Sequence, residues 1–396
     1  MTRREHALRP WNGLHAGLDP AECGKSWQPW ADHPVNQASA NSSTPAPGGL
    51  LGDLRAAVQR NCDIADAQFA GNYSLCTYLL KMREFYRWER GLPFSAALNR
   101  QEVGDWVSER ERSWEELEGL SPEALRLGDV QHDPFDQEAV NRSLDPYGLV
   151  YGAGLGRGAR PLFFLGTLLR REDYNGYQVH VVGAEAARDL VSPPAMSRDD
   201  QIFVRRESVR RLVFEMIEAW QIRGAPADDA LARALAAYGY DPADEATLEA
   251  MTDSEVESAV WHEVGEILAG RALGDAWKER VLAVAGGRHE LVARAVRDHL
   301  ADCLTTLPAL LAEESPGAIH FYFANLTGMR SLLFPQLRSA YESWVAGAPL
   351  AVLKAQIAPA REHWLAVARR FVEETPESWP IHDDALASLR PVFAAP

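Results

Sequence analysis

Apolar side chains recur at helical spacing along most of the chain, beginning near residue 50. A second helix follows the break at Gly71 and ends at Gly91, and a third covers 101–118 behind the capping residue Asn99. Ser121-Pro122 and Asp133-Pro134 each place a proline after a capping residue, which predicts two further helix starts. The first stripe consists of residues three or four positions apart: Leu54, Val58, Cys62, Ala65 and Phe69.

The hydrophobic period changes near residue 147. Segments 148–151, 162–169 and 177–182 are short and apolar, and they are rich in β-branched or aromatic residues. Asn175-Gly176 lies between the last two segments and predicts a tight hairpin. We expect a small antiparallel sheet of two or three strands that packs on helices, because an isolated hairpin is marginally stable in water.

The helical pattern returns near residue 205 and continues almost to the end of the chain. The sequence therefore predicts a mostly α protein, a helical bundle-type body with a small antiparallel β insertion. The predicted regions are an N-terminal arm and linker (1–48), a helical region (49–146), the β element with its loop (147–200) and a helical bundle (201–396). The predicted helices of the bundle cover 205–222, 228–238, 253–270, 275–284, 289–311, 317–332, 335–346 and 350–374.

The arm differs from a solvated tail because it contains Trp11, Trp27 and Trp30. It is followed by a linker rich in Asn, Ser, Pro and Gly at 36–49. Indole rings gain by burial, so we expect the arm either to dock on the body or to contact a protein partner.

Composition narrows the classes of function. The chain has 396 residues, with 40 Lys and Arg against 56 Asp and Glu, and a net charge of −16. This balance argues against a general nucleic-acid binder, which needs clustered basic residues. The apolar runs are far shorter than the ~20 residues of a membrane-spanning helix. The N-terminus is polar and the four cysteines have no C-x-x-C spacing, so we expect reduced thiols in a cytoplasmic protein that does not contact membranes.

Two motifs are better explained by structure than by chemistry. Residues 151–158 (YGAGLGRG) are rich in glycine, but a nucleotide loop needs a helix directly after it, and 160–164 is typical of a strand. Arg83, Arg87 and Arg90 alternate with Glu84 and Glu89, which favours a salt-bridged helix surface over a base-stacking site.

The helix predicted at 253–270 carries polar groups on its apolar side. At 100° per residue, Glu263 falls inside the arc of Val256, Val260 and Val264, while Glu266 lies at the margin of that arc and His262 further round. A carboxylate on the core side is costly unless it is paired or coordinated.

Two later helices repeat this anomaly. His299 and Asp302 share the buried face of 289–311 at i, i+3 spacing, and Asp298 lies at its margin. The predicted helix 317–332 is apolar almost all round, and His320 lies on its narrow strip of small or polar residues.

Together these helices supply ligands for a metal. Oxygen and imidazole ligands on facing helices suit non-haem iron, manganese or zinc. The predicted metal residues are Glu263, Glu266, His299, Asp302 and His320, with His262 as a weaker candidate. This hypothesis describes a metal-binding protein or metalloenzyme, an oxidoreductase or a hydrolase.

Two alternatives remain open at this stage. The same groups could form satisfied polar pairs in the core of a non-enzymatic interaction or adaptor protein, or a metal-free acid–base site. Cys303, one turn after His299, is more typical of packing than of a nucleophile.

Three stretches resemble a group of uncharacterised bacterial cytosolic proteins. They are 61–89 (NCDIADAQFAGNYSLCTYLLKMREFYRWE), 187–208 (ARDLVSPPAMSRDDQIFVRRES) and 320–330 (HFYFANLTGMR). The resemblance covers most of the chain after the arm. It implies no activity, cofactor or catalytic residue, and it sets the chain apart from familiar kinases, hydrolases and dehydrogenases.

Overall fold

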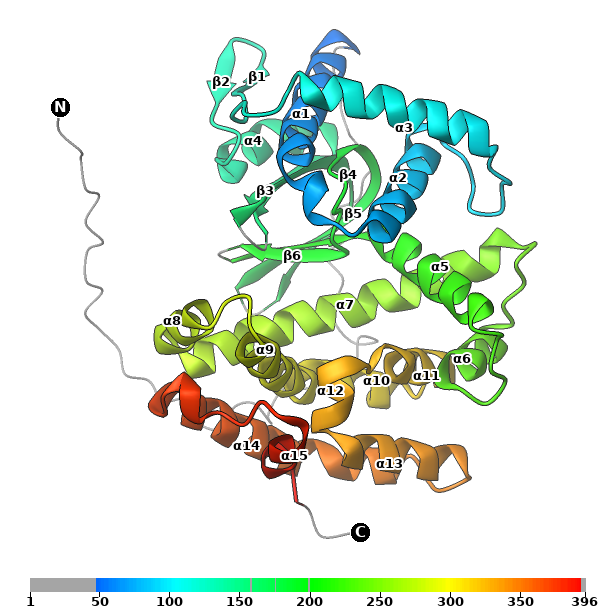
Figure 1. Ribbon diagram of the computed structural model, residues 1–396, viewed down its shortest axis with the longest axis vertical. Coiled ribbons are helices and arrows are strands. Elements are labelled where there is room, and N and C mark those ends of the chain that lie inside the picture. Colours follow the sequence, from blue (N-terminus) through cyan, green and yellow to red (C-terminus); the bar gives the residue numbers. More distant parts are fainter. Residues whose placement is uncertain (1–47, 157–158, 175, 199, 393–396) are drawn as a thin grey trace, which may run out of the picture. The chain divides into compact units, whose positions relative to one another are not determined.

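The first three helices lie where the hydrophobic pattern predicts them. A computed structural model describes residues 48–156, 159–174, 176–198 and 200–392 (Figure 1), with α1 at Gly48–Phe69, α2 at Leu75–Glu89 and α3 at Arg100–Glu115. The Asn99 cap is confirmed, since its side-chain oxygen accepts the backbone N–H of Gln101 at 2.9 Å. The arm that carries Trp11, Trp27 and Trp30 lies outside the described residues.

The two predicted helix starts that follow are wrong. Ser121-Pro122 leads into a two-stranded ribbon, β1 (Leu125–Leu127) and β2 (Val130–His132). Helix α4 (Gln137–Leu144) begins three residues after Pro134, because Asp136 supplies the cap to Ala139 N–H. Asp133 accepts the N–H of Phe135 and closes a turn instead.

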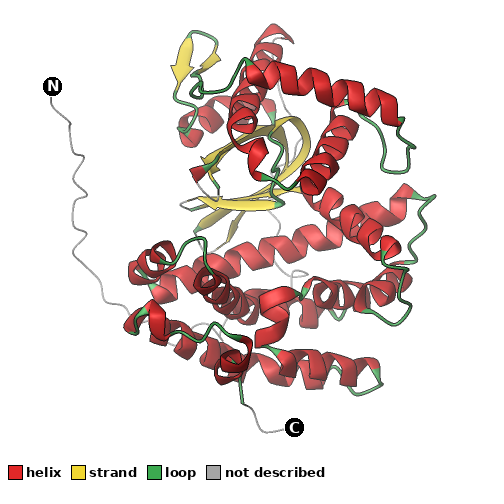
Figure 2. Cartoon of the chain, in the orientation of Figure 1, coloured by secondary structure: helices red, strands yellow, loops and turns green. Residues whose placement is uncertain are grey.

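The β part is larger than the small insertion that the sequence predicts. Five strands form one sheet in the order β3-β4-β5-β7-β6 (Figure 2, yellow). Neighbours are antiparallel except β5 and β7, which are parallel. The predicted pairing of the long strands β4 and β5 is confirmed. The strands are β3 (Leu149–Leu155), β4 (Pro161–Tyr174), β5 (Tyr177–Arg188), β6 (Ala195–Arg198) and β7 (Gln201–Arg205).

The glycine-rich stretch belongs to this sheet. A Cβ atom on Gly152 would lie 2.0 Å from the ring of Phe164 on the neighbouring strand, so close strand packing requires glycine there. Strand β4 begins at Pro161, so a strand follows the stretch, as predicted, and not the helix of a nucleotide loop.

Helix α7 (Glu245–Leu273) connects the sheet with the C-terminal helices, as Figure 1 shows. It is preceded by α5 (Arg206–Ile222) and α6 (Ala230–Tyr238). One face of α7 packs against β5 and β7 through Val256, Val260 and Val264. Helix α1 packs on β4 and β5, where Cys62 and Phe163 share a separate apolar cluster.

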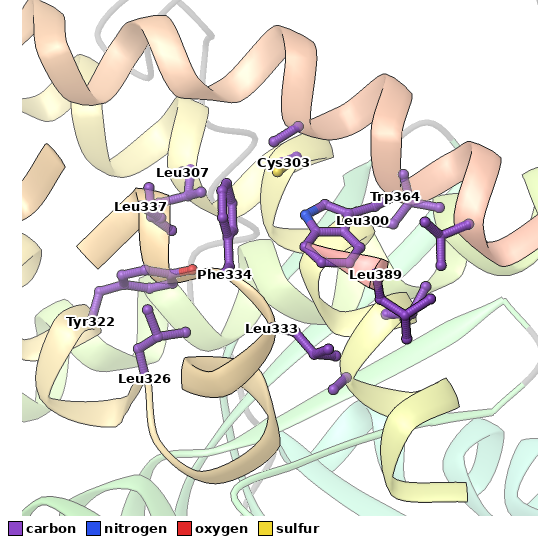
Figure 3. Packing of buried hydrophobic residues seen from close by; sticks show 14 of the residues in the cluster. Leu300, Cys303, Leu307, Tyr322, Leu326, Leu333, Phe334, Leu337, Trp364 and Leu389 are labelled. Carbon is purple, nitrogen blue, oxygen red and sulfur yellow. The ribbon is translucent and has the colours of Figure 1, made fainter. Parts of the chain in front are cut away.

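The remaining helices surround the largest apolar cluster, part of which is drawn in Figure 3. Trp364 is fully buried in it, together with Leu300 and Cys303. The helices are α8 (Asp275–Ala283), α9 (Arg288–Ala301), a π turn (Asp302–Thr306), α10 (Leu307–Glu313), α11 (Pro316–Asn325), α12 (Gly328–Leu333), α13 (Pro335–Val345), α14 (Ala351–Glu373) and α15 (Asp383–Leu386). Short 3₁₀ turns occur at Ala70–Asn72, Asp145–Tyr147, Pro376–Ser378 and Ala387–Leu389.

Two boundaries of the predicted bundle helices are wrong. Helix α7 begins at Glu245 rather than near 253, because Asp244 caps it by accepting the N–H of Ala246. The single helix predicted over 317–332 is broken between α11 and α12, where Gly328 has a φ of 56°. The break separates Tyr322 from Arg330, and both side chains donate to Asp302 at the start of the π turn.

Ion pairs in the N-terminal half are more buried than a solvated helix surface would be. Glu84 and Arg87 are 2% and 6% exposed, so the interpretation of this part of α2 as a solvent-facing surface is wrong. In the sheet, Arg205 on β7 donates from Nε to Glu185 on β5 at 2.5 Å, and both side chains are inaccessible to solvent. No helix among the described residues is long and apolar enough to cross a membrane.

Candidate functional site

Helix α7 packs closely against the end of α9 and the π turn that follows it. A Cβ atom on Gly265 would lie 2.5 Å from the carbonyl oxygen of Ala301, so only glycine fits there. Thr305 donates from Oγ1 to the carbonyl of Trp261 at 2.6 Å and ties the turn to α7. His262 and Glu266 flank this contact on α7 and are therefore carried to α9.

The π turn has a local cause in the sequence. Pro308 has no N–H and its ring conflicts with the carbonyl of Leu304, so an ordinary α-helix cannot continue through this segment. The N–H of Leu307 bonds to the carbonyl of Asp302 instead, five residues back. π turns are rare, and those that occur are often found at functional sites. Here the turn begins with Asp302.

Asp302 is the most buried carboxylate of this region, at 1% exposure. His262 donates from Nδ1 to its Oδ1 at 2.9 Å, and Tyr322 donates its hydroxyl to Oδ2 at 2.7 Å. The guanidinium of Arg330 also binds Oδ2. Burial alone would raise the pKa of this carboxyl group, but Arg330 and His262 outweigh burial and lower the pKa below its ordinary value.

The other ring nitrogen of His262 faces a second carboxylate. Nε2 lies 3.4 Å from Oε1 of Glu266, one turn further along α7. Burial opposes the charged ring, but the hydrogen bonds to Asp302 and Glu266 raise the pKa of His262 to about 10. The imidazole therefore lies between two carboxylates from two elements.

Glu266 and Asp298 form an acidic pair across the two helices. Arg297 binds Glu266 and lies 3.2 Å from Asp298. Burial raises the pKa of Asp298, whereas His262 and Arg297 overcome burial and lower that of Glu266 to about 2. Glu263 lies on the sheet side, where it accepts a hydrogen bond from Ser197 of β6, and burial together with Glu266 raises its pKa to about 7.

Three of these side chains form a cluster that could hold a metal ion. One nitrogen of His262 and one carboxylate oxygen from each of Glu266 and Asp298 lie within 4.8 Å of one another. All three side chains are partly accessible, at 27%, 19% and 21%.

The remaining two predicted histidines have other surroundings. His299 stacks on Trp364 with ring centres 4.8 Å apart, and its Nε2 bonds to the carbonyl of Arg330 at 2.9 Å. Burial lowers the pKa of His299 to about 3, so its ring is neutral. Nδ1 of His320 bonds to the hydroxyl of Tyr341 at 2.9 Å. Neither histidine belongs to the group of three ligands.

Of the five predicted metal residues, only Glu266 belongs to this group of three. Asp302 contacts His262 instead, and Glu263 lies beside Glu266. In the structure the central residue is His262, the weaker candidate, and the group also includes Asp298, which the helical wheel puts at the margin. The i, i+4 spacing of His262 and Glu266 was a usable signal for this pair. No sequence pattern predicted a role for Arg330, because its position depends on the break in the helical segment before Gly328.

Comparison with known proteins places the chain in a family. No curated protein and no solved structure matches it. Residues 53–205 match the N-terminal domain, and residues 210–393 the C-terminal domain, of a family of unknown function, DUF6866. The first match ends with β7, the second begins four residues into α5, and together they cover most of the chain. The chain therefore belongs to the DUF6866 family, which agrees with the expected likeness to an uncharacterised family.

Proposed function

We propose that this protein binds a divalent metal ion through His262, Glu266 and Asp298, as a metal-binding protein or metalloenzyme. The observation that carries the proposal is the hydrogen bond between Nδ1 of His262 and buried Asp302. Histidine ligands of metals commonly donate their other ring N–H to a carboxylate, which fixes the tautomer and the ring orientation. With Nδ1 committed in this way, a metal on the side of Glu266 would bind Nε2 by displacing its proton, because the raised pKa of His262 keeps both ring nitrogens protonated in the metal-free chain.

The support for His262 is itself held in place. Asp302 accepts hydrogen bonds from Tyr322 on α11 and Arg330 on α12, besides His262. Its carboxylate cannot rotate without breaking one of these bonds. Four separate helical segments therefore fix one imidazole ring, which is more organisation than a surface ion pair needs.

The donor set restricts the metal. One imidazole nitrogen and two carboxylates suit Mn²⁺, Fe²⁺ or Zn²⁺, and no thiolate takes part. Cys303 is close in sequence but lies in the apolar core, where burial raises the pKa of its thiol. Three protein ligands leave positions on the ion for water or a substrate, which is typical of catalytic rather than structural sites.

Arg297 is the main obstacle to this arrangement. It binds Glu266 and lies next to Asp298, so it occupies part of the space that a cation would take. Its side chain is 25% exposed and can turn toward solvent. A divalent ion would then replace two positive charges, the guanidinium of Arg297 and the displaced proton of His262, so the local charge stays balanced.

A metal measurement tests the proposal directly. The full chain is stripped with a chelator, incubated with Mn²⁺, Fe²⁺ or Zn²⁺ separately, desalted, and analysed for bound metal. We expect close to one equivalent of one of these ions. Glu266→Gln and Asp298→Asn should each lower retention at least tenfold, while Glu279→Gln, an exposed control on α8, should not change it. Less than about a tenth of an equivalent of every ion in the unaltered chain would refute the proposal.

The contacts of Asp302 favour a second candidate, a polar network that only stabilises a non-enzymatic protein. Both carboxylate oxygens have partners without any ion, and Glu266 is paired with Arg297. In that case the stripped chain retains no metal. Glu266→Gln would then lower its melting temperature, because Arg297 loses its ion-pair partner, and would have no metal retention to reduce.

A further inference from the structure

A cavity of about 650 Å³ opens between α4 and the sheet, away from α7. Successive side chains of a strand point to opposite faces, and Val179 and Val181 of β5 face α7. Gln178 and His180 therefore point the other way, into the cavity that they line. Every lining residue except Phe135 and Gly176 has a polar side chain.

The floor of this groove holds two polar atoms without hydrogen-bond partners among the described residues. One is Nδ1 of His180, whose side chain is 97% buried and stacks on Phe203. The other is Nε of Arg171, which stands directly opposite His180 on the neighbouring strand β4. Buried polar atoms are nearly always bonded, so this pair indicates a missing partner.

The chemistry of the two atoms defines that partner. The guanidinium of Arg171 is a donor only. Burial lowers the pKa of His180 to about 4, so its ring is neutral and one ring nitrogen can accept. A hydroxyl group can accept from one of these atoms and donate to the other, which a carboxylate or an ammonium group cannot do.

The other side chains that line the groove favour the same kind of ligand. Five carboxylates and three arginines line the groove, and Asp145 already neutralises Arg171. The excess of negative charge disfavours phosphorylated ligands. Amide and carboxylate groups such as those of Gln178, Asp173 and Gln201 offer both donors and acceptors to neighbouring hydroxyls. Phe135 supplies an apolar surface at the edge.

We propose that this groove binds a neutral, hydroxyl-rich small molecule of the carbohydrate class. Its volume lies within the range of about 300–1,000 Å³ that is usual for ligand sites. The groove and the proposed metal centre lie on different sides of α7 and share no residue. The inference therefore stands or falls independently of metal binding.

Saturation-transfer NMR and titration calorimetry on the full chain test the proposal. The probes are cellobiose, maltotriose, sucrose and trehalose, with glucose 6-phosphate as the charged comparison. We expect at least one neutral saccharide to bind with a millimolar or lower Kd, and glucose 6-phosphate to bind more weakly. His180→Phe should weaken binding at least tenfold. Gln178→Ala, at an exposed position that preserves folding, should weaken it at least fivefold.

The control is Gln221→Ala on α5, an exposed glutamine outside the groove, which should leave the Kd unchanged. Three results would overturn the proposal. The first is that no neutral probe binds at concentrations of about 10 mM, on the order of the weakest useful affinities. The second is binding that survives both groove substitutions, and the third is a preference for glucose 6-phosphate.

Discussion

A Cβ atom on Gly265 would lie 2.3 Å from Oγ1 of Thr305, so the side chain of Thr305 reaches α7 only because residue 265 has no side chain. This contact sets the distance between His262 on α7 and Asp302 at the start of the turn. The hydrogen bond of Thr305 to the carbonyl of Trp261 holds the same interface. The geometry of the proposed centre therefore depends on a residue that has no functional group.

Gly265→Ala should destabilise the protein. Alanine is favoured over glycine inside a helix by about 1 kcal/mol, but here the added methyl group meets the backbone of Ala301 and must push α7 away. We expect a net loss of about 1–3 kcal/mol in the free energy of unfolding, as for other overpacked sites. Gly270→Ala on the same helix meets nothing within 4 Å and should be neutral or stabilising. Urea denaturation of both variants checks this, and equal effects would contradict it.

Asp302→Asn should lower the stability of the metal-stripped chain by about 3–5 kcal/mol. The substitution keeps the shape of the side chain but leaves the guanidinium of Arg330 and the imidazole of His262 without their negative partner. Asp275→Asn is the matched control, because this carboxylate is 89% exposed and should change stability little. A loss below about 1 kcal/mol for Asp302→Asn would show that the buried charge is dispensable.

Glu185 and Arg205 should behave as a coupled pair in a double-mutant cycle. Both side chains are fully buried, and removing either one leaves the other with only a more distant opposite charge, Arg188 at 3.8 Å from Glu185 or Asp189 at 4.0 Å from Arg205. Glu185→Leu and Arg205→Met should therefore each cost about 3–5 kcal/mol. The double variant Glu185→Leu with Arg205→Met should recover most of this loss, because it removes both charges and preserves the apolar contact with Phe164. Additive losses in chemical denaturation would indicate that the two side chains act separately.

Histidine burial should make the fold sensitive to acid. The pKa of His180 is about 4 in the folded chain, lowered from 6.5 chiefly by burial and then by Arg171. Above pH 6.5 the ring is neutral in both states. Between pH 6.5 and 4 the unfolded chain binds a proton that the folded chain does not, so stability falls with falling pH, by at most about 1.4 kcal/mol per pH unit.

His180→Asn removes this linkage. Measured by urea denaturation at pH 7 and 4.5, its stability should fall less with acid than that of the unaltered chain. His382→Asn, at an exposed position, is the control and should follow the unaltered chain. A parallel decline in all three proteins would show that His180 does not contribute to acid sensitivity.

Periodicity predicted helices well where an apolar face has a clear phase. The segment 253–270 placed Glu263 and Glu266 near the core side correctly, because the valines of α7 mark that side. The segment 317–332 is apolar all round and therefore carries no phase. Its break at Gly328 could not be predicted from the pattern, and for this reason the position of Arg330 could not be predicted either.

The sequence also could not predict which residues of other elements contact each buried side chain. The wheel identified His299 as buried, but whether a buried ring meets a ligand, a carbonyl or Trp364 depends on helix crossings that no local pattern encodes. Strands β6 and β7 were missed for a related reason. They have four and five residues, and the parallel pairing of β7 with β5 is a long-range feature.

The place of α7 has a consequence for how the chain unfolds. Its valines complete the sheet of the N-terminal family domain, while its opposite face packs on the π turn of the C-terminal one. Pulling the two family domains apart would expose Val256, Val260 and Val264 to water, at a cost of about 1.5–3 kcal/mol for each side chain. We therefore expect the two halves to unfold together, so that the family boundary near residue 208 does not separate two independently folding units.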